Sequence, residues 1–75
     1  MLLTERERNV LKLVINGEDN HRIASMLGIK ANTVKSYKTR IVFKYRYFGI
    51  KNLRELLKFY QKLKKENPEL KFMNH

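Results

Sequence analysis

The side chains between Asn32 and Lys44 are the ones whose types and spacing allow chemistry. Amine, guanidinium and hydroxyl groups recur there, and such groups donate hydrogen bonds to anionic oxygens and to base edges. The chain has few side chains that could act in catalysis. It has no cysteine, one aspartate (Asp19), and no serine or threonine with an evident acid or histidine partner. His21 and His75 stand alone, without a second ligand at metal spacing. The residue types predict a protein that binds a polyanion, not an enzyme, with no metal and no other cofactor.

Positive charge is concentrated in the second half of the chain. The 75 residues carry a formal net charge of +10. Residues 1–29 hold four basic and four acidic side chains, whereas residues 30–65 hold twelve basic and one acidic side chain. Like charges at this density repel one another and typically serve a polyanionic partner; the alternative is a merely solvated face. Nucleic acid is the expected partner, and an anionic membrane surface is the lesser alternative.

Length and composition restrict the chain to one small domain. We expect a domain over residues 1–67 and a short C-terminal tail over residues 68–75. No apolar run approaches the roughly 18 residues of a membrane span, and no signal-peptide pattern opens the chain. These features favour a cytoplasmic protein without a membrane partner, and nothing in the sequence indicates a small-molecule ligand.

Apolar periodicity predicts an all-α fold of four helices, over about 5–16, 20–27, 31–48 and 53–66. Thr4 followed by Glu7 is typical of a capping box at a helix start. Gly17 is placed to end the first helix. Gly28 permits the left-handed backbone of a tight turn between the second and third helices. Pro68 follows the end of the fourth helix.

The third predicted helix has two different faces. Its apolar residues recur at spacings of three and four and predict one buried stripe, made of Val34, Tyr37, Ile41, Tyr45 and Phe48. The opposite face is polar and basic. A helix of this kind, joined by a short turn to a supporting helix, is typical of a helix-turn-helix, whose second helix lies in the major groove of DNA. That groove admits an α-helix and presents a distinguishable pattern of donors and acceptors.

Several short motifs stand in order along residues 3–57. They are Leu3-Thr4-x-Arg6-Glu7-Arg8-x-Val10-Leu11, Gly17, Ile23-Ala24-x-x-Leu27-x-Ile29, Thr33-Val34-Lys35, Ile41-x-x-Lys44, Gly49-Ile50-Lys51-Asn52 and Glu55-Leu56. In this order and spacing they resemble the DNA-binding domain of bacterial transcription regulators of the LuxR/NarL/GerE type. Residues 23–40, with the turn Leu27-Gly28-Ile29, are also similar to region 4 of bacterial sigma factors.

The resemblance implies a sequence-specific regulator of transcription that binds double-stranded DNA through its third helix and forms a homodimer through its fourth. By position, the expected base-reading residues are Lys35, Ser36 and Thr39. The expected phosphate contacts are Asn20, His21, Asn32, Thr33, Lys38, Arg40 and Lys44. The expected dimer contacts are Leu56, Phe59 and Leu63, which are spaced as one seam. With no regulatory domain before Leu3, the protein is expected to act as a stand-alone dimer.

Three departures from the family pattern bear on geometry. Lys30 stands where the family usually has a serine that caps the third helix, so the cap is expected to be missing or shifted to Asn32. Tyr37 replaces a common histidine, as a bulkier filler of the same inner site. Between Lys44 and Gly49 the chain has Tyr45-Arg46-Tyr47-Phe48, about three residues more than the family pattern, which is expected to lengthen the third helix by nearly a turn and displace the fourth.

Phe43 and Tyr47 lie four residues apart and outside the buried stripe. They are expected either to pack beneath the fourth helix or to form an exposed aromatic patch. The alternative function is therefore a protein-interaction module on the same scaffold, which binds RNA polymerase or another regulator through Phe43, Tyr47 and Phe59. A third alternative is a non-specific nucleoid or single-strand binder, which the lack of a clear base-stacking platform disfavours.

Overall fold

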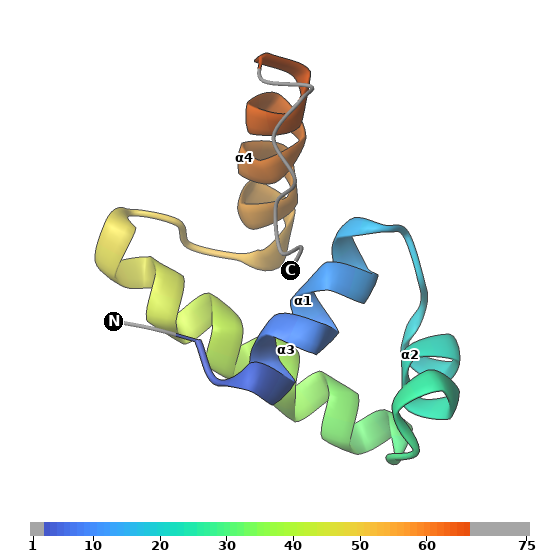
Figure 1. Ribbon diagram of the computed structural model, residues 1–75. Coiled ribbons are helices and arrows are strands. Elements are labelled where there is room, and N and C mark those ends of the chain that lie inside the picture. Colours follow the sequence, from blue (N-terminus) through green and yellow to red (C-terminus); the bar gives the residue numbers. More distant parts are fainter. Residues whose placement is uncertain (1–2, 67–75) are drawn as a thin grey trace.

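The computed structural model describes residues 3–66, and this part of the chain is entirely helical with no strand (Figure 1). The elements are α1 (Glu5–Ile15), α2 (Asn20–Leu27), α3 (Ala31–Tyr45), the short 3-10 helix η1 (Arg46–Phe48) and α4 (Leu53–Glu66). The predicted all-α fold of four α-helices is confirmed for these residues. The predicted tail over residues 68–75, with Pro68, lies outside the described residues.

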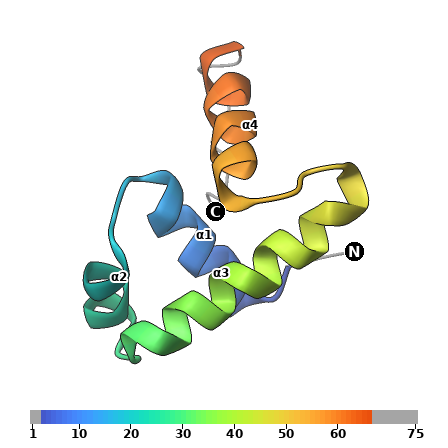
Figure 2. The same cartoon turned by 180° about the vertical axis from the view of Figure 1, so that it is seen from behind.

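Three of the helices form one body, and α4 is attached to it at its start and projects from it. Figure 1 shows α1, α2 and α3 packed together, with α4 rising from them at a steep angle. Seen from behind in Figure 2, α3 crosses the front of the body and α1 lies behind it. The helix that is expected to read DNA is therefore on the outside of the three-helix body.

Local signals in the sequence fix where α1 begins. The Thr4 hydroxyl accepts a hydrogen bond from the Glu7 amide (3.1 Å), and the Glu7 carboxylate accepts one from the Thr4 amide (2.9 Å). Two amides that have no partner inside the helix are satisfied in this way. The helix ends at Ile15, one residue earlier than predicted, and Gly17 follows at a φ of 90°.

The start of α2 and the turn after it follow the same logic. The Asp19 carboxylate accepts a hydrogen bond from the Arg22 amide (2.8 Å). Gly28 takes the left-handed conformation, with φ 68° and ψ 35°, which costs a glycine little. The Ile29 amide then donates to the Ala24 carbonyl (3.0 Å). The chain thereby leaves α2, changes direction and enters α3 at Ala31.

The core draws on every α-helix. Its buried apolar residues are Val10, Leu11 and Val14 of α1, Ile23 and Ala24 of α2, Val34 and Ile41 of α3, and Leu56 of α4. Burial of each large side chain contributes about 1.5–3 kcal/mol. Because Val34 and Ile41 are seven residues apart, they lie on one side of α3 and hold that side against α1 and α2.

The end of α3 differs from the prediction. The α-helix stops at Tyr45, and the three residues that were expected to extend it form η1, which Gly49 closes at a φ of 84°. A 3-10 helix has three residues per turn, so side chains after Tyr45 depart from the α-helical stripe. Phe48 was predicted to be buried in that stripe, but 62% of its surface is exposed. Tyr45 keeps its inner position, and its hydroxyl is hydrogen-bonded to that of Tyr60.

A partly buried ion pair joins α1 to α3. The Lys44 ammonium nitrogen lies 2.6 Å from Glu7 Oε1, and Glu7 is buried. Burial alone raises the pKa of Glu7, but hydrogen bonds from Lys44 and Thr4, with the Lys44 charge, outweigh it and hold this pKa below its ordinary value of 4.5. Lys44 was expected to contact DNA phosphate. The structure places its ammonium group on a buried carboxylate, and its contact with phosphate stays a prediction.

We expect Lys44→Ala to lower the free energy of unfolding by about 3 kcal/mol near neutral pH, because it leaves a buried carboxylate without its cation. The stabilisation from ionised Glu7 is present above pH 4.5 and is lost as the pH falls through the lowered pKa. The difference between wild type and variant is therefore expected to shrink on acidification, and urea unfolding across that range measures it.

The matched control for this pair is Glu5→Gln, which neutralises an exposed carboxylate in the first turn of the same helix. Its effect on stability is expected to be small throughout. A Lys44→Ala deficit that stayed constant between about pH 7 and about pH 3 would contradict the role given to the pair.

Candidate nucleic-acid interface

The outer face of α3 is polar, basic and accessible. Since Val34 and Ile41 face the core, residues on the opposite side of the helix face solvent. The exposed side chains of the helix are Asn32, Lys35, Ser36, Thr39, Arg40 and Phe43. In Figure 2 no other helix lies in front of this part of α3. The three expected base-reading residues thus share one accessible face.

Two of these residues hold their hydroxyl groups close to the backbone. Ser36 Oγ donates to the Asn32 carbonyl (3.2 Å), and Thr39 Oγ1 donates to the Lys35 carbonyl (3.1 Å). In this state each hydroxyl oxygen presents lone pairs outward and acts as an acceptor, and rotation about the C–O bond would present the proton instead. The exposed Lys35 ammonium supplies a permanent donor on the same face.

Arg40 lies to one side of this face and is supported by an aromatic ring. Its guanidinium carbon is 5.2 Å from the centroid of the Tyr37 ring, within the range of a cation–π interaction. Tyr37 is half-buried and packs against the core, in the inner site expected for it. The ring therefore fills the inner site and orients a cation beside the outer face.

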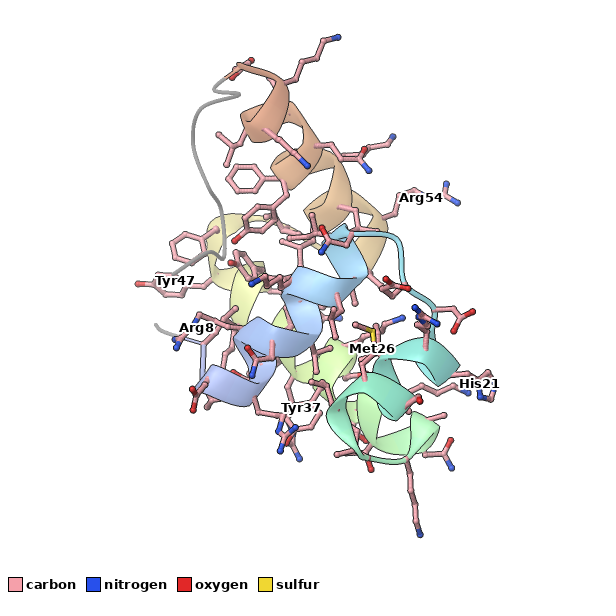
Figure 3. All side chains as sticks on the ribbon, turned by 45° about the vertical axis from the view of Figure 1, so that its right-hand side comes forward. Arg8, His21, Met26, Tyr37, Tyr47 and Arg54 are labelled. Atoms are coloured by element: carbon pink, nitrogen blue, oxygen red, sulfur yellow. The ribbon has the colours of Figure 1, made fainter. Side chains whose placement is uncertain are left out.

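The expected phosphate contacts of α2, Asn20 and His21, share one shallow basin of about 520 Å³ with two of those of α3, Asn32 and Lys38. We call it the α2–α3 basin. It is lined by Asp19, Asn20, His21, Ala31, Asn32, Lys35 and Lys38. Figure 3 shows the His21 side chain pointing outward at the edge of α2. Thr33 is half-buried at the start of α3 and does not line the basin.

Asn20 has an unusual position in this basin. Its Oδ1 atom is buried and has no hydrogen-bond partner among residues 3–66. Phosphate oxygens are acceptors, so a contact between Asn20 and phosphate requires the amide nitrogen, not this oxygen. A donor such as water would supply the hydrogen bond that this buried oxygen needs.

Lys38 is half-buried, unlike the exposed Lys35 and Arg40 of the same helix. Burial lowers its pKa, whereas the charge of Asp19 acts to raise it. Lys38 also lines a second concavity at the other end of α3, so one cation is shared by two basins.

The expected dimer seam is only partly accessible. Leu56 is fully buried in the core, so its expected place in a dimer contact is wrong: the residue is used to attach α4 to the body. Phe59 keeps 44% of its surface exposed, and Leu63 is half-buried.

Phe43 and Tyr47 are 66% and 78% exposed, so they do not pack beneath α4. Of the two alternatives for these aromatic residues, the structure therefore supports exposure at the surface. Figure 3 shows Tyr47 on the side of the molecule opposite His21.

Sequence reasoning missed two features of the site. The partnership of Glu7 with Lys44 was missed because 37 positions separate them. Arg46 and Lys51 were counted in the charge excess but were not placed on the surface, although they lie beside Phe43 in the second concavity. The charge excess over residues 30–65 was the available signal for these two cations, and only the course of η1 brings them together.

Among the described residues, no cluster of three or more histidine or acidic side chains could hold a metal ion. In residues 3–66, no helix is long and apolar enough to span a membrane.

The geometry of α2, the turn at Gly28 and α3 defines the class: a helix-turn-helix domain with an accessible, basic second helix. The chain belongs to the LuxR family of bacterial regulatory proteins, since the family model GerE (bacterial regulatory proteins, luxR family) matches residues 1–60. No curated protein and no solved structure matches the chain significantly. The family match confirms the resemblance found in the sequence, and with it a DNA-binding domain of a transcription regulator.

The start of α3 lacks the side-chain cap that Ser, Thr, Asp or Asn would provide. Lys30 occupies the N-cap position with no side-chain hydrogen bond to the helix within the described structure, and Asn32 lies inside the helix and not at its cap. We therefore expect Lys30→Ser to raise the free energy of unfolding by about 1 kcal/mol. Lys30→Ala is the control, because it removes the same charge without providing a cap. Equal stability of the two variants in urea unfolding would contradict this reading.

Proposed function

We propose that this protein is a sequence-specific regulator that lays α3 in the major groove of double-stranded DNA. One observation carries the proposal: Lys35, Ser36 and Thr39 share the exposed face of α3, opposite the buried Val34 and Ile41. A helix anchored in this way presents donors and acceptors to base edges without any rearrangement of the core. Catalysis has no part in this proposal.

The side chains divide into two roles. Lys35, Ser36 and Thr39 face base edges, where an ammonium group donates to guanine O6 and N7 and hydroxyl groups contact several bases. The proposed phosphate contacts are Asn20, His21, Asn32, Thr33, Lys38 and Arg40. Such contacts fix the position of the domain on the duplex and carry no sequence information themselves.

We expect Lys35→Ala and Thr39→Ala to reduce discrimination between the preferred duplex and a scrambled one, by about 1–3 kcal/mol for a residue that makes a good base contact. In vitro selection from a random pool of duplexes supplies the preferred sequence, and gel-shift titrations then measure both affinities. Arg8→Ala, which removes an exposed cation from α1, is the control. If Lys35→Ala weakened both duplexes equally, the base-reading assignment would be wrong.

We further propose that two copies associate through the part of α4 that projects from the body. Phe59 supports this surface because it is a large apolar side chain exposed on that helix. The expected contact of Leu63 remains a prediction. A symmetric dimer would place two α3 helices about 34 Å apart, in successive major grooves of a near-palindromic site. Stand-alone action and a cytoplasmic location also remain predictions.

We expect Phe59→Ser to shift the protein toward monomer and to weaken binding to the two-half-site duplex more than to a single half-site. Sedimentation equilibrium and gel shifts measure these two effects. Phe48→Ser is the matched control, since Phe48 is an exposed aromatic residue outside α4. An unchanged molecular mass for Phe59→Ser would speak against the α4 interface.

A second candidate function has one observation in its favour. Tyr47 and Phe48 are both exposed, with ring centroids 5.4 Å apart in an edge-to-face arrangement, and exposed aromatic pairs are common in protein interfaces. The domain would then be an interaction module that binds RNA polymerase or another regulator. Binding to purified polymerase together with no duplex binding at low salt would favour this function.

A further inference from the structure

The second concavity lies where the C-terminal half of α3 faces the loop that leads to α4. Figure 2 shows this loop running back above α3 before α4 begins. The concavity has a volume of about 380 Å³, and its lining includes Lys38, Phe43, Arg46 and Lys51. We call it the α3–α4 basin. It is on the opposite end of α3 from the α2–α3 basin.

The charge of the α3–α4 basin is of one sign. Lys38, Arg46 and Lys51 contribute three cations, and none of the described residues that line it is acidic. The acidic residue nearest to the basin in sequence is Glu55. Its carboxylate accepts a hydrogen bond from the Lys51 backbone amide (2.7 Å). A concavity lined by one sign of charge concentrates ions of the opposite sign, here anions.

The loop that carries Lys51 is fixed by hydrogen bonds. Asn52 Oδ1 accepts a hydrogen bond from the Glu55 backbone amide (2.9 Å), and the Glu55 carboxylate accepts one from the Lys51 backbone amide. This reciprocal arrangement is a cap for the first turn of α4. The backbone that carries Lys51 is therefore held beside α3.

Phe43 adds an apolar surface to these cations. It follows Thr39 by four residues and so lies on the same side of α3, with 66% of its surface exposed. The sugar–phosphate backbone of DNA alternates anionic phosphates with deoxyribose rings that present C–H groups. In the basin, the cations can contact the phosphates and the aromatic ring can pack against the C–H groups of a deoxyribose between them.

The basin also lies at a suitable distance from the base-reading residues. Eight residues separate Lys35 from Phe43, a rise of about 12 Å along an α-helix. The major groove is about 12 Å wide. When the first half of α3 faces base edges, its second half therefore reaches the strand that borders the groove.

We propose that the α3–α4 basin binds the sugar–phosphate backbone of the strand that borders this groove. Arg46 and Lys51 contact phosphates, and Phe43 packs against a deoxyribose. The inference rests on the proposed function, and it adds a second backbone site on the α4 side of the reading helix. This site contributes affinity for any sequence and makes binding depend on DNA that flanks the bases being read.

Salt titrations of the full chain on the selected duplex test this proposal. Each phosphate contact contributes about −0.9 to the slope of log affinity against log salt, so Arg46→Ala and Lys51→Ala are each expected to make the slope shallower by about 0.9. Phe43→Ala is expected to weaken binding several-fold at every salt concentration with the slope unchanged, because the ring carries no charge. All three side chains are exposed, so the variants are expected to unfold at the same urea concentration as wild type.

Matched controls separate the basin from general charge and general apolarity. Arg8→Ala removes one exposed cation from α1, and Tyr47→Ala removes one exposed ring outside the basin. Both are expected to leave the slope and affinity unchanged. Hydroxyl-radical footprinting is expected to show protected deoxyriboses beside the recognised bases, and Phe43→Ala is expected to lose that protection.

The outcomes distinguish this inference from the proposed function. If Arg46→Ala, Lys51→Ala and Phe43→Ala bind like wild type while Lys35→Ala loses discrimination, only the basin proposal is overturned. If wild type binds no duplex at low salt, both proposals are overturned. If Phe43→Ala loses binding to purified polymerase and keeps its affinity for DNA, the ring belongs to a protein interface and the basin proposal is overturned.

Discussion

The rotation of α3 about its own axis is the constraint on which the rest of the structure depends. Burial of Val34 and Ile41 turns one side of the helix inward. The ion pair between Glu7 and Lys44 adds a fixed contact with α1 three residues after Ile41. A helix with these anchors has one orientation, because any large rotation would expose apolar surface and separate a buried charge from its partner. Lys35, Ser36 and Thr39 face solvent as a consequence.

With α3 held in this orientation, each of its ends borders a different basic basin. The first turn meets the start of α2, where Asn20 and His21 border the α2–α3 basin. The last turn passes into η1, and the loop to α4 brings Lys51 beside Phe43. Backbone contacts at both ends of a reading helix would fix its register on the duplex, as phosphate contacts generally do. The core of this small domain also attaches α4, through the buried Leu56 and the half-buried Leu53, Leu57 and Tyr60.

Local signals made most of the fold predictable from the sequence. The capping box at Thr4, the glycine turn at Gly28 and the apolar period of each helix act over a few residues, and the structure contains all three. The bounds of α2 and α4 were predicted correctly, whereas η1 was not, because 3-10 turns are frequent at the ends of α-helices and the apolar period does not mark where such a turn begins. In the site, the exposed face of α3 followed from periodicity. The ion pair of Lys44 and the burial of Leu56 depend on how distant elements meet, which no local pattern contains.

The most direct measurement of the central claim is an NMR titration of isotope-labelled protein with the selected duplex. The largest chemical-shift changes are expected on the outer residues of α3, from Asn32 to Phe43. Nuclear Overhauser contacts between the methyl groups of Ile41 and those of α1 are expected to persist in the complex. Changes concentrated on α1, or loss of those methyl contacts when DNA binds, would contradict the fixed orientation of α3.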